Sequence, residues 1–438
     1  MLPAAAAAAL SGLIGAIGAD SRWLVALGRT IVHAGSIPDR VPYATADTHG
    51  WPNVPALAEV TFYGLHSAFG NRGLAAAQLV AVGAAFLLLT LDMRDSGATP
   101  TSWLPASLCV WLGGFAAWVV VRVQLFSLVL FAVLTVLLRA ETRRPSRRIW
   151  LLVPVVALWS NLHGAVLVGL AVAWAYLLFE RLRHDAATAL GAGAVATAAL
   201  FVTPALWRTG DYYRGVLENE AARRGVGLWG RLSLHSGVDL VLLAVGLVLL
   251  ALALLARPLP RAWELVALAG LAFLTVRAAR TGVFLLFLAA TPAARALPFR
   301  VRPGRPLAPP FVAAAAIGVV VALVRGPLAT GASARLLNRA LADARGTPVL
   351  AEDQLAEQVA LDGGRIWVGN PIDAFRRADQ RTYVEWIEGE PGGDAALAHA
   401  PRAVLARRDG DAAHRLARDR RFRRVGEDAH AVLYLRAR

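Results

Sequence analysis

Five ionisable residues of this chain stand next to long apolar segments. They are Asp20, Arg122, His163, Arg277 and Arg280. Charged groups at membrane depth cost on the order of a few kcal/mol each, so those that occur commonly have a function. An arginine binds phosphate through two parallel hydrogen bonds, and a carboxylate can accept the proton of a hydroxyl nucleophile. The combination predicts a site for a lipid-linked phosphosugar.

Further polar residues accompany these positions. The residues that we predict to bind substrate are Arg29, Asp47, His49, Glu59, Arg122, Asn161, His163, Arg277 and Arg280. Asn161 and His163 belong to the sequence WSNLHGA, which interrupts an apolar segment. Non-helical backbone at membrane depth is tolerated where it lines a cavity, so this break indicates a polar cavity.

Each candidate also has a purely structural explanation, which the sequence leaves open. Asp20 directly precedes an expected helix, and Asp is a preferred N-cap residue. Arg22 would then be only its solvated partner. Arg122 can extend from a helix end to lipid head groups, and Arg29 with His33 can face the same head groups from an interfacial helix. The other candidates can hold loop turns or form polar pairs.

Apolar helices are the elements that position these residues. Hydrophobic residues make up 57% of the chain and charged residues only 17%, which is too apolar for an ordinary soluble enzyme. A membrane-spanning helix needs about 20 apolar residues. The expected helices are 3–19, 73–93, 103–121, 123–139, 149–160, 162–180, 188–204, 239–256, 262–277, 281–298 and 308–324. The sequence therefore predicts an α-helical polytopic membrane protein with about eleven transmembrane helices.

Basic residues orient this bundle. All of them are arginines, and they cluster at Arg139–Arg148, Arg181–His184, Arg257–Arg261 and Arg300–Arg305. Cytoplasmic loops carry an excess of basic residues, so an N-terminus inside the cell sends all four clusters to the cytoplasm. The long segments 20–72 and 205–238 then lie outside, and the five ionisable residues fall at the same outer level. The net charge of +15 thus reflects topology, because no nucleic-acid-binding motif is present.

The C-terminal quarter differs in composition from the rest. Segment 326–438 is charged, and its short apolar runs alternate with helix-like stretches, which predicts a small extracytoplasmic α/β domain after a bundle formed by 1–325. Cys109 is the one cysteine, so a disulfide within the chain is excluded. No Walker motif, nucleophile elbow or His/Cys metal spacing is present in the sequence, so an ATP-driven pump or a hydrolase has little support.

The order of motifs resembles that of bacterial membrane glycosyltransferases of the GT-C superfamily. The residues that carry the resemblance are Asp20, Trp23, Gly28–Arg29, Gly35–Pro38, Tyr43, Thr45, Gly50–Trp51, Glu59, Arg122–Gln124, Asn161–Gly164, Arg277–Arg280 and the C-terminal sequence FRRVGEDAHAVLYLR. The resemblance implies a transferase that uses a polyprenyl-phosphate sugar and an essential carboxylate in the first outer loop, a role that falls on Asp20. The sequence Asp20-Ser21-Arg22-Trp23 departs from the superfamily by lacking a second acid. A divalent metal is therefore possible but not supported.

We accordingly predict a multi-pass protein of the inner (plasma) membrane that moves a sugar from a polyprenyl-phosphate donor to an extracytoplasmic glycan or lipid acceptor. Asp20 is the expected general base. Its expected partners are the donor, membrane lipid and the acceptor, and no nucleic acid. The alternative is a non-catalytic membrane protein that binds or translocates a lipid-linked or anionic ligand with the same arginines.

Overall fold

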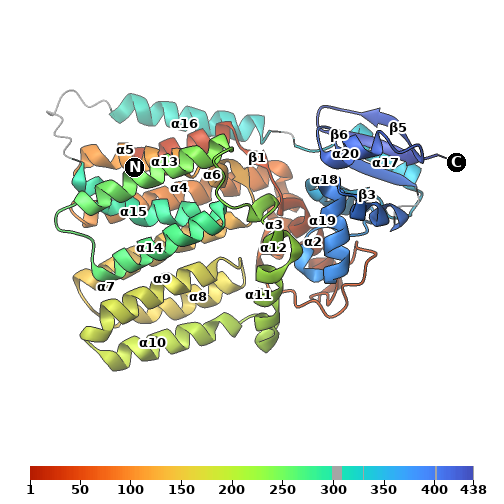
Figure 1. The fold of residues 1–438 in the computed structure, drawn as a ribbon. Coiled ribbons are helices and arrows are strands. Elements are labelled where there is room, and N and C mark those ends of the chain that lie inside the picture. The colour runs from red at the N-terminus through yellow and green to blue at the C-terminus, as the bar shows by residue number, and fades with distance from the viewer. Residues whose placement is uncertain (298–307, 329, 400–401, 438) are drawn as a thin grey trace. The chain divides into compact units, whose positions relative to one another are not determined.

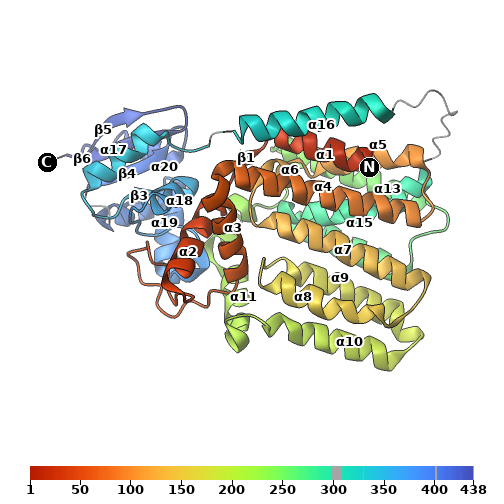
Figure 2. The ribbon, with the colours of Figure 1, turned by 180° about the vertical axis from the view of Figure 1, so that it is seen from behind.

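The computed structural model describes residues 1–297, 308–328, 330–399 and 402–437 (Figures 1 and 2). The chain divides into two compact units, each built from three segments. Unit 1 comprises Met1–Ala16, Phe69–Thr203 and Gly225–Leu328, and unit 2 comprises Ile17–Ala68, Pro204–Arg224 and Ala329–Arg438. The expected arginine cluster 300–305 lies outside the described residues.

Unit 1 consists almost entirely of helices. They are α1 (Leu2–Leu13), α4 (Asn71–Asp95), α5 (Pro100–Gly113), α6 (Phe115–Val119), α7 (Gln124–Arg143), α8 (Leu152–Ser160), α9 (Val166–Phe179), α10 (Ala186–Ala198), α13 (Gly237–Leu255), α14 (Ala262–Arg277), α15 (Gly282–Ala296) and α16 (Ala308–Arg325). Every segment expected to be helical contains one of these helices. The short strands β1 (Ala16–Ile17) and β2 (Val120–Val121) complete the regular elements of this region.

The lengths of these helices differ from the expectation more than their positions do. Within the described ranges, three helices, α4, α7 and α13, are long and apolar enough to cross a membrane, or up to four if a bent pair counts as one span. Several others are short because breakers interrupt them. Gly114 separates α5 from α6, and the polar break at Asn161 ends α8 after nine residues. Eleven transmembrane helices therefore remain a prediction.

Small side chains bring the helices of unit 1 close together. Helix α1 packs against α4 and α16, and a Cβ atom added to Gly12 would lie 2.5 Å from a methyl group of Leu79. Such close approach is how helices associate where no water drives their packing. Phe86, Trp118 and Phe287 fill the interior, with the Phe86 and Trp118 ring centroids 4.9 Å apart.

One arginine of the expected cytoplasmic cluster 139–148 is buried inside unit 1. Arg139 forms ion pairs with Asp92 and Glu264, the latter with Nε 2.8 Å from Oε1. Its Nη2 atom also donates to the carbonyl of Leu288 at 2.7 Å. Arg139 therefore holds helices together instead of facing the cytoplasm, because a buried charge is stable only when its partners satisfy it.

Unit 2 is an α/β unit with a four-stranded sheet. Its helices are α2 (Ser21–Ala34), α3 (Ala56–Phe69), α11 (Thr209–Glu218), α12 (Glu220–Arg224), α17 (Ala334–Ala344), α18 (Asp353–Leu361), α19 (Arg377–Ile387) and α20 (Asp411–Leu416). Its strands are β3 (Leu350–Ala351), β4 (Ala403–Arg407), β5 (Phe422–Glu427) and β6 (Ala431–Arg436). They are ordered β3-β4-β6-β5, with β3 parallel to β4 and the other pairs antiparallel. The small C-terminal sheet that the sequence indicated is present.

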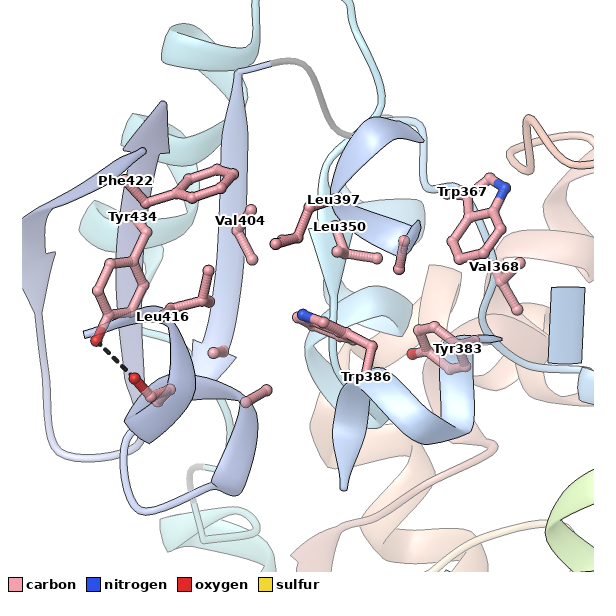
Figure 3. Packing of buried hydrophobic residues seen from close by; sticks show 14 of the residues in the cluster. Leu350, Trp367, Val368, Tyr383, Trp386, Leu397, Val404, Leu416, Phe422 and Tyr434 are labelled. Carbon is pink, nitrogen blue, oxygen red and sulfur yellow. Dashed lines mark hydrogen bonds between the residues drawn. The ribbon is translucent and has the colours of Figure 1, made fainter. Parts of the chain in front are cut away.

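A buried apolar cluster packs against this sheet. Val404 and Tyr434 come from the sheet, and Trp386 and Leu416 come from the helices (Figure 3). The Tyr434 hydroxyl donates to the carbonyl of Ala413 at 3.2 Å, which satisfies the polar end of a buried ring.

The first loop is part of the fold of unit 2. Backbone N–H of Thr45 donates to Ile366 O at 2.9 Å, and Ile366 N–H donates to Tyr43 O at 3.0 Å. The second loop joins the same unit through Arg224, which pairs with four carboxylates. These are Glu220, Glu385, Glu388 and Glu390. Three segments far apart in the chain thus share one folded unit.

Candidate functional site

Asp20 lies at the start of α2 in an unusual conformation. Its φ of 78° is left-handed, and its side chain makes no capping hydrogen bond to the helix. Instead, Oδ1 accepts a hydrogen bond from the indole N–H of Trp23 at 3.1 Å. Left-handed backbone is unfavourable for residues other than glycine, and such strain clusters at functional sites. Asp20 therefore stands at the N-cap position without acting as a cap.

A second carboxylate contacts Asp20 directly. Oε1 of Glu357, on α18, accepts the backbone N–H of Asp20 at 2.9 Å and the side-chain N–H of Asn370 at 2.8 Å. The carbonyl of Asn370 in turn accepts the hydroxyl of Tyr43 at 3.0 Å. Residue Glu357 is 1% exposed. Neither α18 nor Glu357 was expected, although Glu352 and Asp353 are acids of the kind that mark a helix start.

Asp373 is a further acid that interacts electrostatically with Asp20. Its Oδ2 accepts the indole N–H of Trp51 at 3.0 Å. Burial, opposed by that hydrogen bond and supported by the charge of Asp20, raises the pKa of Asp373 to about 6. Unit 2 therefore surrounds Asp20 with negative charge and with indole donors.

Glu59, a predicted substrate ligand, is fully buried in α3. Its Oε2 accepts the side-chain N–H of Asn53 at 2.8 Å, and its Oε1 has no hydrogen-bond partner among the described residues. Burial raises the pKa of Glu59 to about 8, against the opposing effect of the Asn53 hydrogen bond. The side chain is thus held as a neutral acid at moderate pH.

Arg22 is buried and not solvated, contrary to one reading of the sequence. It is 8% exposed, and its Nη2 donates to the carbonyl and the hydroxyl of Thr330 at 2.9 and 3.1 Å. Burial lowers the pKa of Arg22, while the nearby charges of Glu357 and Asp362 oppose this effect. Arg22 therefore supplies positive charge to the acids near Asp20.

The other predicted residues of the first loop lie nearer the surface. His33 is exposed and shares a hydrogen bond with the Tyr63 hydroxyl at 3.1 Å. Arg29 is half-buried. Asp47 pairs with Arg376 and accepts the backbone N–H of His49 at 3.0 Å. These contacts hold the loop, and a role of Arg29, Asp47 or His49 in binding stays a prediction.

Unit 1 brings together three of the predicted outer residues. Arg122 and Arg280 both interact electrostatically with the half-buried ring of His163. The Ser127 hydroxyl lies 2.7 Å from His163 Nδ1, and the backbone N–H of Ala165 donates to the same nitrogen at 3.3 Å. Because Nδ1 accepts from Ala165, Ser127 is the donor and the ring proton belongs on Nε2. The positive charges of Arg122 and Arg280 therefore both act on the His163 ring.

Arg280 is oriented by an aromatic ring that the sequence did not single out. Its Cζ atom lies 3.6 Å from the ring centroid of Trp229. The carbonyl of Arg280 also accepts a hydrogen bond from Gln124 at 3.4 Å. Arg277 is exposed, and its role in binding stays a prediction. Asn161 donates to the carbonyls of Ala157 and Val202 at 2.8 and 2.6 Å, which binds the helix break together.

A cavity of about 750 Å³ lies elsewhere in unit 2. It is lined by α20 and its neighbours, including Trp386, Asp394 and Arg415, and contains none of the predicted site residues. Among the described residues, no group of three or more His, Cys, Asp or Glu side chains is placed to hold a metal ion.

Asp20 and Glu59 belong to unit 2, whereas Arg122, Asn161, His163, Arg277 and Arg280 belong to unit 1. Each unit collects its own part of the predicted set. The convergence of Asp20 with the arginines remains a prediction from topology.

Comparison with known proteins identifies the fold. No family model and no curated protein matches the chain. The structure is similar to ArnT from Cupriavidus metallidurans in the apo state, with a TM-score of 0.54 and 13% identity over 98% of this chain and 95% of that one. ArnT bound to undecaprenyl phosphate gives a TM-score of 0.51 and 13% identity over 99% and 96%.

A mycobacterial structure gives the same result. Arabinofuranosyltransferase AftD has a TM-score of 0.52 and 15% identity, and the match covers 99% of this chain but only 39% of AftD. The chain therefore has the fold of the GT-C membrane glycosyltransferases. The resemblance in sequence motifs implied this fold, and at least three described helices are long and apolar enough to cross a membrane.

Proposed function

We propose that the protein is a glycosyltransferase that moves a sugar from a polyprenyl-phosphate donor to an acceptor outside the cytoplasmic membrane. The observation that supports this most is the GT-C fold combined with the strained, non-capping Asp20 in the first loop. One structural neighbour binds undecaprenyl phosphate, which is the chemistry of the proposed donor.

The proposal assigns separate tasks to the two units. In unit 1, Arg122, Arg280 and the Nε2–H of His163 bind the donor phosphate. In unit 2, Asp20 accepts the proton of the acceptor hydroxyl as that oxygen attacks the sugar carbon. The bond from that carbon to the phosphate oxygen breaks, and the polyprenyl phosphate leaves with the electron pair. A positioned general base contributes about 10²–10⁴-fold to such a step.

The test uses the full chain in lipid nanodiscs with a panel of radiolabelled polyprenyl-phosphate sugars. Transfer or release of label from one donor is expected, and Asp20→Asn should lower turnover by about 10²–10⁴-fold with unchanged melting temperature. Asp409→Asn, at an exposed turn, is the matched control and should be fully active. Full activity of Asp20→Asn would show that the assignment of the base is wrong.

The runner-up function, binding or translocation of a lipid-linked anion without catalysis, uses the same arginines. It predicts that polyprenyl phosphate binds to the protein and that Arg280→Gln weakens this binding. No donor in the panel should lose its sugar. Binding without transfer would therefore favour this alternative.

A further inference from the structure

Glu357 has no role in the function proposed above, yet it is held in an unusual way. Its Oε1 accepts the Asp20 and Asn370 hydrogen bonds, while its Oε2 is buried without a hydrogen-bond partner among the described residues. A buried polar atom left unsatisfied costs about 1–3 kcal/mol. A side chain that served only to cap a loop would not need to be an acid, because an amide oxygen accepts the same two bonds.

The hydrogen bond from Asp20 to Glu357 restrains a strained residue. The N–H that Glu357 accepts belongs to the residue with φ of 78°. Left-handed backbone persists at a non-glycine residue only where its surroundings over-determine it. The Trp23 indole adds to that restraint through its hydrogen bond to the Asp20 carboxylate. Glu357 therefore holds the backbone of Asp20, while Trp23 orients its carboxylate.

The charges around Glu357 favour its neutral form. Burial and then the charge of Asp20 raise its pKa above the ordinary range, and the hydrogen bonds from Asp20 and Asn370 and the charge of Arg22 oppose this. Tyr43, in the first loop, and Tyr383, in α19, interact electrostatically with the same carboxyl group, and Asp353 lies one helical turn away in α18. Burial of a carboxyl group disfavours its charged form.

We propose that Glu357 is a positioning residue for Asp20: it holds the Asp20 backbone, and its buried carboxyl group is kept as the neutral acid. This inference rests on the proposed role of Asp20. It assigns to the C-terminal segment a direct part in the chemistry of the first loop, through a residue 337 positions away in the chain.

Two variants separate the two parts of the proposal. Glu357→Gln keeps an oxygen that accepts both N–H groups, but its amide cannot ionise. Turnover at neutral pH should therefore be retained. Turnover should also fall less than in the wild type when the pH is raised. Glu357→Ala removes the restraint on Asp20, so kcat should fall at least about tenfold, with the KM of the donor little changed. Glu427→Gln, an exposed acid on β5, is the control.

Infrared spectroscopy of the full chain tests the proton without any assay of activity. The difference spectrum between wild type and Glu357→Gln at neutral pH should show the carbonyl band of one protonated carboxyl group. Absence of that band, or full kcat in a folded Glu357→Ala variant, would overturn the inference. Inactive Asp20→Asn together with fully active Glu357→Ala would leave the proposed function intact and remove only this inference. Active Asp20→Asn would remove the proposed function instead.

Discussion

The guanidinium group of Arg280 lies over the indole ring of Trp229, with Cζ 3.6 Å from the ring centroid. Such a contact contributes about 0.5–2 kcal/mol, depending on how far the pair is desolvated. Trp229→Leu should therefore weaken the binding of polyprenyl phosphate by roughly 2–30-fold, because Arg280 loses its orientation while keeping its charge. Binding to nanodisc-embedded protein, measured by thermophoresis, checks this.

The matched control for that prediction is Trp150→Leu, which removes a partly exposed indole from the same unit. It should leave the affinity for polyprenyl phosphate unchanged. Equal loss of affinity in both variants would indicate a general effect of indole removal and would argue against an orienting role for Trp229.

Glu59 should make stability depend on pH. Its pKa is raised from the ordinary 4.5 to about 8, so the folded state binds the proton more tightly than the unfolded state does. The protonated Glu59 side chain contributes to the free energy of unfolding. This contribution is fully present below pH 4.5 and is lost as the pH rises to about 8, by at most about 1.4 kcal/mol per pH unit. Glu59→Gln should reduce the dependence of the melting temperature on pH across this window, while Glu357 and Asp373 keep their own contributions. Differential scanning fluorimetry measures this.

The exposed acid Glu218 provides the comparison for Glu59, since no burial opposes its charge. Glu218→Gln should keep the wild-type dependence of melting temperature on pH. If Glu59→Gln also kept it, the carboxyl group of Glu59 would not be the source of that dependence.

Gly28 marks the place where α2 crosses α3. A Cβ atom at this position would lie 2.1 Å from the backbone oxygen of Glu59, which cannot move aside without shifting its helix. Gly28→Ala should therefore destabilise unit 2 by about 1–3 kcal/mol through overpacking. Gly64→Ala, in α3 with open space around it, should instead be neutral or stabilise the helix by up to about 1 kcal/mol. Melting temperatures that fell equally in both variants would contradict the close crossing.

Helix positions in unit 1 could be predicted because apolar run length is a local property. Segment 262–277 was expected to be helical and is α14 with the same bounds. The expectation for 3–19 extended too far, because α1 ends at Leu13 before glycine-containing sequence. The structure bears out the helices themselves, whereas the number that span the membrane is not established by it.

Burial could not be predicted from the same pattern. Arg139 and Arg22 both stood in charged sequence that indicated contact with water, and both are buried by partners more than 40 residues away. A local pattern gives the period of an element but not the charges that another segment brings to it. The helix α18 was also not expected from the sequence.

The sequence by itself determined that Asp20 begins a helix and that arginines and a histidine stand at helix breaks, because residue type and spacing carry that information. Only the tertiary structure decided that Asp20 does not cap this helix, and that Glu357 of the C-terminal segment accepts its backbone N–H. The physical reason is that desolvation and charge coupling depend on which groups are adjacent in space, and 337 positions of chain separate these two.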